Sequence, residues 1–149
     1  FAGRLCVIDC RLLGEGGCIA AECIERSLQD IELPQWVLFA TGWDRFWNEN
    51  KYFMGAHPVL TTEAIEFLTG LPLSGVGFDA PGPDAFGELE RHRALFKSVP
   101  LVVENLTGLT ALADCLQAHP GACARFFAFP LKLDCPDGAP VRAVAEVIF

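Results

Sequence analysis

Short apolar runs alternate with amphipathic stretches along most of the chain. That alternation is typical of a sheet with helices packed against it, so the pattern predicts an α/β fold. The predicted strands are residues 5–9, 36–41, 76–79, 101–104, 126–133 and 141–149, and the predicted helices are 20–28, 61–68, 85–96 and 107–118. The last two strands are longer and are separated by Cys-Pro-Asp-Gly at 135–138. Because Asp-Gly favours tight turns, the chain is expected to close with a β-hairpin.

Composition supports one domain without long linkers. The 149 residues are 52% hydrophobic and 20% charged, and no Ser- or Gly-rich segment divides them. The net charge is -8 and the basic residues are scattered, which argues against nucleic acid as a partner. No window holds the 18 or more apolar residues of a membrane span, so we expect no membrane contact. Seven cysteines without a CxxC pair favour free thiols, and we therefore expect a soluble, cytoplasmic protein.

Polar residues follow four of the predicted strands, and ligands of open α/β sheets gather at such strand ends. They are Asp9, the turn Thr41 to Asp44, Asp79 with the later Asp84, and Glu104. Asp9 and Asp84 have a purely local interpretation as turn or cap residues. Glu104 is a poorer capping residue and follows an apolar run. A carboxylate there is costly to desolvate unless a cation meets it, which makes Glu104 a candidate metal ligand.

The three histidines differ in their surroundings. His57 and His119 each precede a proline, and surface or packing roles are expected for both. His92 lies within the predicted helix 85–96, where the local interpretation is a solvated residue on a charged face. If that helix packs beside the next strand, His92 comes near Glu104. Imidazole nitrogen and carboxylate oxygen together suit zinc or manganese.

Several segments in order resemble the cyclase family of metal-dependent hydrolases, which includes bacterial kynurenine formamidases and isatin hydrolases. They are VLFATGW at 37–43, HPVLTTEA at 57–64, GVGFD at 75–79 followed by Asp84, His92, LVVENL at 101–106, FPLKL at 129–133 and GAPVRAVA at 138–145. The resemblance implies a swivelling β/β/α-type layered domain, with a mixed sheet, flanking helices and a C-terminal hairpin. It also implies a divalent metal, zinc or manganese, to which His92 and, twelve residues later, Glu104 contribute as ligands.

The sequence departs from the family in one respect. The family signature HxGTHxDxPxH, which supplies most metal ligands and the catalytic histidine, does not occur in residues 1–149. The chain is therefore expected to be a single cyclase-like domain that corresponds to the C-terminal two thirds of a member and lacks the N-terminal metal-motif segment. Two ligands hold a catalytic metal poorly, so the 149 residues alone are expected to be inactive, and no catalytic residue is assigned.

For a complete member the resemblance implies hydrolysis of an amide or cyclic amide by metal-activated water, as in the arylformamidase step of tryptophan catabolism. The expected substrate is a small aromatic amide, for which Trp43, Phe46 and Trp47 are candidate wall residues; core packing is the alternative for all three. The resemblance also suggests a homodimer or larger homo-oligomer. Two other hypotheses stay open, a non-catalytic short homologue or fragment that acts as a binding module, and an unrelated α/β binding domain.

Overall fold

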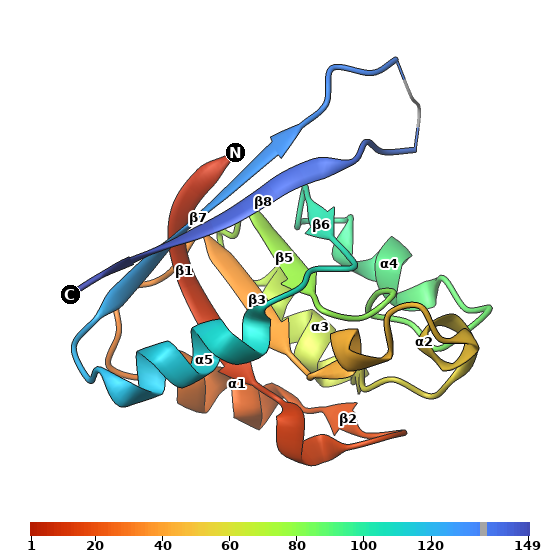
Figure 1. Ribbon diagram of the computed structural model, residues 1–149, viewed down its shortest axis with the longest axis horizontal. Coiled ribbons are helices and arrows are strands. Elements are labelled where there is room, and N and C mark those ends of the chain that lie inside the picture. Colours follow the sequence, from red (N-terminus) through yellow and green to blue (C-terminus); the bar gives the residue numbers. More distant parts are fainter. Residues whose placement is uncertain (135–136) are drawn as a thin grey trace.

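The computed structural model describes residues 1–134 and 137–149, and its centre is a six-stranded mixed sheet (Figure 1). Four neighbouring strands are parallel, and the last two add to them as an antiparallel pair. In spatial order the strands are β6 (Val102–Val103), β5 (Gly75–Phe78), β3 (Trp36–Ala40), β1 (Ala2–Asp9), β7 (Cys123–Pro130) and β8 (Val141–Ile148). A separate two-stranded sheet pairs β2 (Cys18–Ile19) with β4 (Val59–Leu60).

Helices cover both faces of the parallel part of the sheet. One core cluster joins alternate strand residues such as Ile8 and Phe39 to α1 (Ala21–Leu28), α3 (Thr62–Thr69) and α4 (Glu90–Leu95). A second cluster joins Leu5 and Leu38 to α5 (Leu109–Ala118) on the other face. Figure 1 shows α5 in front of the strands and α3 behind them. Among the described residues, no helix has the length and apolar character needed to cross a membrane.

The central strands are buried on both faces because each face meets a helical layer. Every residue of β3 and of β5 is buried. Strands covered on both sides read as continuous apolar runs, and this explains why these two were visible in the sequence. Three further short helices lie in the loops of the chain: η1 (Arg11–Leu13), η2 (Trp43–Phe46) and α2 (Asn50–Met54).

The predicted mixed α/β architecture, with flanking helices and a C-terminal strand pair, is confirmed, but several predicted bounds differ from the structure. The strand predicted at 126–133 is β7 at Cys123–Pro130, and the helix predicted at 107–118 begins at Leu109. The helix predicted at 85–96 begins only at Glu90, because residues 84–89 form a loop that lets Asp84 bind the start of the helix. The strand predicted at 101–104 is reduced to Val102–Val103. Cys135 and Pro136 of the predicted hairpin turn lie outside the described residues.

The carboxylate of Asp9 ties the end of β1 to its surroundings. It accepts hydrogen bonds from the Arg11 side chain at 2.8 and 2.6 Å and from Gln117 Nε2 of α5 at 2.9 Å. The bond with Arg11 is the main cause that lowers the pKa of Asp9 from 3.8 to about 2. A carboxyl group with a lowered pKa stabilises the fold where it is ionised, and partial exposure to solvent weakens the effect.

Asp9→Asn is expected to lower the free energy of unfolding at neutral pH by about 1 kcal/mol. The unfolded chain takes up the proton near the ordinary pKa of 3.8, so the difference from wild type should shrink below that pH and vanish as the pH falls through about 2. Urea unfolding of both proteins across this range measures it. Glu25→Gln, at an exposed position on α1, is the control. A difference that does not change with pH would contradict the prediction.

Candidate functional site

Asp84 binds the first turn of α4, although it lies six residues before the helix begins at Glu90. Its two carboxylate oxygens accept the backbone N–H groups of Arg91 at 2.7 Å and of His92 at 2.9 Å. The residue that precedes the helix, Leu89, has no side chain that can cap it, and the first N–H groups of a helix need acceptors. Asp84 is buried, with 5% of its surface exposed, and it therefore acts as a distant N-terminal cap.

The same carboxylate orients the ring of His92. Asp84 Oδ2 lies 2.6 Å from His92 Nδ1, and the other ring nitrogen, Nε2, lies 2.7 Å from Glu104 Oε1. His92 is therefore held between two carboxylates, which raise its pKa; the hydrogen bond with Glu104 is the largest cause. Without a metal, the ring favours a proton on each nitrogen. The predicted proximity of His92 and Glu104 is present in the structure.

Backbone contacts fix the direction of Glu104, which follows β6. Asn105 N donates to Ala80 O at 3.1 Å, and Leu106 N donates to Phe78 O at 2.9 Å. Asn105 adopts a left-handed conformation with φ of 57°, which Asn tolerates better than most residues. Its side-chain oxygen accepts the hydroxyl of the buried Tyr52 at 3.0 Å. The chain turns sharply after Glu104 and leaves that side chain beside His92.

Gly82 approaches this pair too closely for any larger residue. A Cβ atom at position 82 would collide with Glu104 Oε1 and would lie 2.8 Å from His92 Cε1. Its φ of 155° adds a conformational reason for glycine. The loop between β5 and α4 therefore forms one wall of the His92–Glu104 pair with bare backbone, close to the donor atoms.

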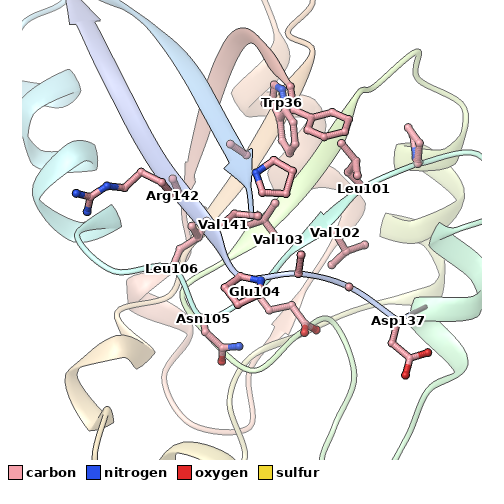
Figure 2. Close-up of a pocket in the computed structure, with 18 of the residues that line it drawn as sticks. Trp36, Leu101, Val102, Val103, Glu104, Asn105, Leu106, Asp137, Val141 and Arg142 are labelled. Atoms are coloured by element: carbon pink, nitrogen blue, oxygen red, sulfur yellow. The ribbon is translucent and has the colours of Figure 1, made fainter. Parts of the chain in front are cut away.

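A cleft of about 790 Å³ opens on the other side of Glu104. It lies between the β6 region and the distal part of the β7–β8 hairpin, and its walls include Trp36, Leu101 and Val141. Figure 2 shows Glu104 and Asn105 together at one end of this cleft and Trp36 at the opposite end. One candidate metal ligand thus borders a space large enough for a small organic molecule.

Asp79 has a different task from Asp84, although both follow β5. It is fully buried and accepts hydrogen bonds from Thr41 N at 2.9 Å, from Gly42 N at 2.8 Å and from the Thr41 hydroxyl. Burial raises its pKa, and these three donors oppose that effect. Asp79 therefore joins the ends of β3 and β5 and is not oriented toward the His92–Glu104 pair by any of its bonds.

The sequence gives little indication that the side chain of His57 is buried. Only 3% of its surface is exposed, and neither ring nitrogen has a hydrogen-bond partner among the described residues. Burial lowers its pKa, while the backbone of Gly82 and Asp84 opposes the shift. Its ring centroid lies 6.0 Å from that of Trp43. The proline that follows the histidine gives no signal of this burial.

The three aromatic residues that were expected to form a substrate wall differ in how far their side chains are buried. Trp43 is 1% exposed, and its Nε1 donates to Tyr52 O at 2.9 Å, so its ring belongs to the core. Phe46 packs edge-on against Trp43 with ring centroids 4.9 Å apart. Trp47 is 45% exposed and packs against Tyr52. None of the three lines the cleft beside Glu104.

Residues 1–134 and 137–149 contain no cluster of three or more His, Cys, Asp or Glu side chains arranged to hold a metal ion. His92 and Glu104 therefore form a pair of donors, with Asp84 behind the histidine. Carboxylates in that outer position commonly fix the ring orientation of a metal-binding histidine.

The comparisons with known proteins identify the family. The model of the putative cyclase family matches residues 1–85, which is more than half of the 149-residue chain. The chain belongs to the cyclase family. The matched region ends just after Asp84, so the roles of His92 and Glu104 depend on their geometry and not on this match.

Two curated relatives agree with this assignment. The chain is 32% identical to an isatin hydrolase of Roseibium aggregatum over 125 residues, which are 79% of this chain and 47% of that protein. It is 29% identical over 137 residues to an uncharacterized protein of Methanocaldococcus jannaschii, with 89% of this chain and 63% of that protein covered. The chain thus spans about half to two thirds of the length of these relatives.

Solved structures share the fold. A cyclase structure superposes with a TM-score of 0.78 at 21% identity and covers 97% of this chain and 53% of its own. An isatin hydrolase bound to the product analogue thioisatinate gives a TM-score of 0.73 at 22% identity, covering 99% of this chain and 60% of its own. A predicted metal-dependent hydrolase from Bacillus stearothermophilus gives 0.68 at 26% identity, covering 98% and 63%.

Thr41→Val is expected to destabilise this cyclase-family chain by about 1 to 3 kcal/mol, because the buried Asp79 loses its hydroxyl donor without a replacement. The free energy of unfolding in urea measures the effect. Thr69→Val is the matched control, since the Thr69 hydroxyl donates to Glu66 O at an exposed helix end. Equal losses in the two variants would contradict the role given to Asp79.

Proposed function

We propose that this chain supplies part of the metal site of a hydrolase that cleaves amide or cyclic amide bonds. The observation that supports this most is the convergence of His92 Nε2 and Glu104 Oε1 to 2.7 Å, with Asp84 fixing the far side of the ring. The names of the relatives, isatin hydrolase and predicted metal-dependent hydrolase, favour the same reaction class.

The donors fit a divalent metal such as zinc or manganese. Neutral imidazole nitrogen and carboxylate oxygen are ligands that both ions accept. His92 Nε2 and Glu104 Oε1 face each other at 2.7 Å, and a metal ion bound by both atoms would take the place of the hydrogen bond between them. Catalytic zinc usually has three protein ligands, so the pair requires at least one more ligand from outside the described residues.

A divalent metal bound here would polarise a carbonyl group as a Lewis acid and would lower the pKa of its bound water to about 7. Three residues of this chain position the donor atoms for such a metal. With a metal bound, Asp84 would accept Nδ1–H, and the neutral ring of His92 would offer the lone pair of Nε2 to the metal. The turn at Asn105 directs the Glu104 carboxylate toward the same point. Gly82 limits the space on one side.

The cleft beside Glu104 supports a small aromatic substrate. Trp36, Leu101 and Val141 give the cleft apolar surface that suits an aromatic ring, and Glu104 and Asn105 lie at the end where the amide would react. We propose an arylformamidase-like or isatin-hydrolase-like specificity for the complete site, with formylated aromatic amines and cyclic aromatic amides as the two substrate types. Isatin is the cyclic amide suggested by the name of the relative.

Replacing either donor is expected to weaken metal binding with little effect on the fold. Calorimetric titration with Zn²⁺ or Mn²⁺ of a metal-free full-length protein, in which this chain is joined to a family metal motif, should show a loss of about 10-fold or more in affinity for His92→Ala and for Glu104→Ala. His119→Ala is the control, since His119 lies at the exposed end of α5. Unchanged binding in both site variants would refute the ligand assignment.

Activity is tested in a full-length protein that contains this chain together with a family metal motif. Hydrolysis of isatin and of N-formylkynurenine is followed by absorbance, and we expect turnover of at least one substrate that stops when the metal is removed and returns when it is restored. Metal binding without turnover of either substrate would favour the non-catalytic binding module over the hydrolase.

A further inference from the structure

The side chain of Asn105, the residue after Glu104, is oriented from the interior of the protein. Its amide oxygen Oδ1 accepts the hydroxyl of Tyr52 at 3.0 Å. Tyr52 is 1% exposed, and burial raises the pKa of its hydroxyl above the usual range, so this group stays a neutral O–H donor at neutral pH. Because that donor occupies the oxygen of the amide, the nitrogen Nδ2 is the end that remains to bind another molecule.

Tyr52 is itself held by aromatic residues of the segment between β3 and β4. Trp43 Nε1 donates to Tyr52 O at 2.9 Å. The rings of Trp47 and Phe53 pack edge-on against the Tyr52 ring, with centroids 4.8 and 4.9 Å away. The backbone N–H of Asn105 is also bound, to Ala80 O at 3.1 Å. A side chain that is fixed in advance at both ends loses little further freedom when a ligand binds.

The amide of Asn105 lies beside the proposed metal ligand. Glu104 and Asn105 both line the cleft of about 790 Å³. Figure 2 shows the amide nitrogen of Asn105 on the side of the Glu104 carboxylate and the amide oxygen on the far side. A carbonyl group that enters this end of the cleft therefore meets an N–H donor next to Glu104.

Amide hydrolysis is a reaction in which such a donor is useful. The oxygen of water bonds to the carbonyl carbon, the C–N bond breaks, and the leaving nitrogen takes a proton from the water. Negative charge develops on the carbonyl oxygen as the water adds. An N–H donor that is already directed at this oxygen stabilises the charge, and asparagine side chains serve in this way in other hydrolases.

We propose that Asn105 Nδ2 binds the carbonyl oxygen of the amide substrate, and that Tyr52 is a positioning residue that holds Asn105 in this orientation. The inference rests on the hydrolase function proposed above and adds a substrate contact to it. It also gives Trp43 and Trp47 a different task from the expected substrate wall, because both act on the site through Tyr52.

Glycine at position 105 removes the amide but tolerates the left-handed backbone, so it tests the contact without straining the turn. In the full-length protein, Asn105→Gly should lower kcat/KM about 10-fold or more for the substrate that wild type hydrolyses, and it should change the calorimetric affinity for Zn²⁺ by less than about threefold. Asn48→Gly is the matched control, because Asn48 is exposed and also has a positive φ, of 75°. The control should leave kcat/KM unchanged.

A double-variant cycle tests the positioning role of Tyr52. Tyr52→Phe keeps the ring but removes the hydroxyl, so the amide of Asn105 is free to rotate, and kcat/KM should fall about threefold or more. In the Asn105→Gly background the same change should have no further effect on kcat/KM, because Tyr52 acts only through Asn105. A purely structural role for Tyr52 would instead lower kcat/KM by the same factor in both backgrounds.

Nuclear magnetic resonance provides a readout that does not need turnover. The side-chain NH₂ signals of Asn105, assigned by their loss in Asn105→Gly, should shift when isatinate, the product of isatin hydrolysis, is added to the Zn²⁺-loaded full-length protein. The signals of Asn48 should not shift.

The outcomes separate this inference from the proposed function. An active wild type with unchanged kcat/KM in Asn105→Gly, a fall in Zn²⁺ affinity as large as the fall in kcat/KM, or unshifted Asn105 signals would each overturn the substrate contact and leave the hydrolase function standing. Equal effects of Tyr52→Phe in both backgrounds would overturn the role of Tyr52. A wild type that hydrolyses neither isatin nor N-formylkynurenine and does not bind isatinate would overturn the proposed function together with this inference.

Discussion

The candidate site depends on one buried carboxylate, that of Asp84. It satisfies two backbone N–H groups at the start of α4 and at the same time accepts the Nδ1–H of His92. The same carboxylate thus caps the helix and orients the ring, so the orientation of the His92 ring depends on the residue at which the helix begins. A helix of six residues has little intrinsic stability, and this cap is a substantial part of what orders it.

The sheet supplies the second half of the site through its backbone. The pairing of β5 with β6 brings the loop that contains Gly82 and Asp84 beside the residue that ends β6. Asn105 and Leu106 then bind the carbonyl groups of Ala80 and Phe78, so the two loops are joined directly. Glu104 gains its direction from these main-chain bonds, and this leaves its own carboxylate free for His92.

The sequence could predict the parts of this arrangement that depend on local pattern. β3 and β5 are readable as apolar runs, and Glu104 stands out because a carboxylate follows such a run. The role of Asp84 is not readable, because its cap joins residues seven and eight positions apart across a loop. The same is true of His57, which is buried beside the distant Trp43, and of β2 and β4, whose two-residue strands are too short for a periodic signal.

The helix that was predicted too long shows how a contact between distant residues changes local structure. Residues 85–89 contain no proline and could continue the amphipathic pattern of 90–96. A helix that began at Ala85 would carry Asp84 as an ordinary adjacent cap, and the carboxylate could not reach the ring of His92. The helix instead begins at Glu90, after Gly87 with a φ of 82°, and so loses about one turn of helical hydrogen bonds. In return, the loop lets the Asp84 carboxylate reach the first turn of α4. The geometry of the His92–Glu104 pair therefore requires the loop at residues 84–89, and this requirement outweighs the helix propensity of these residues.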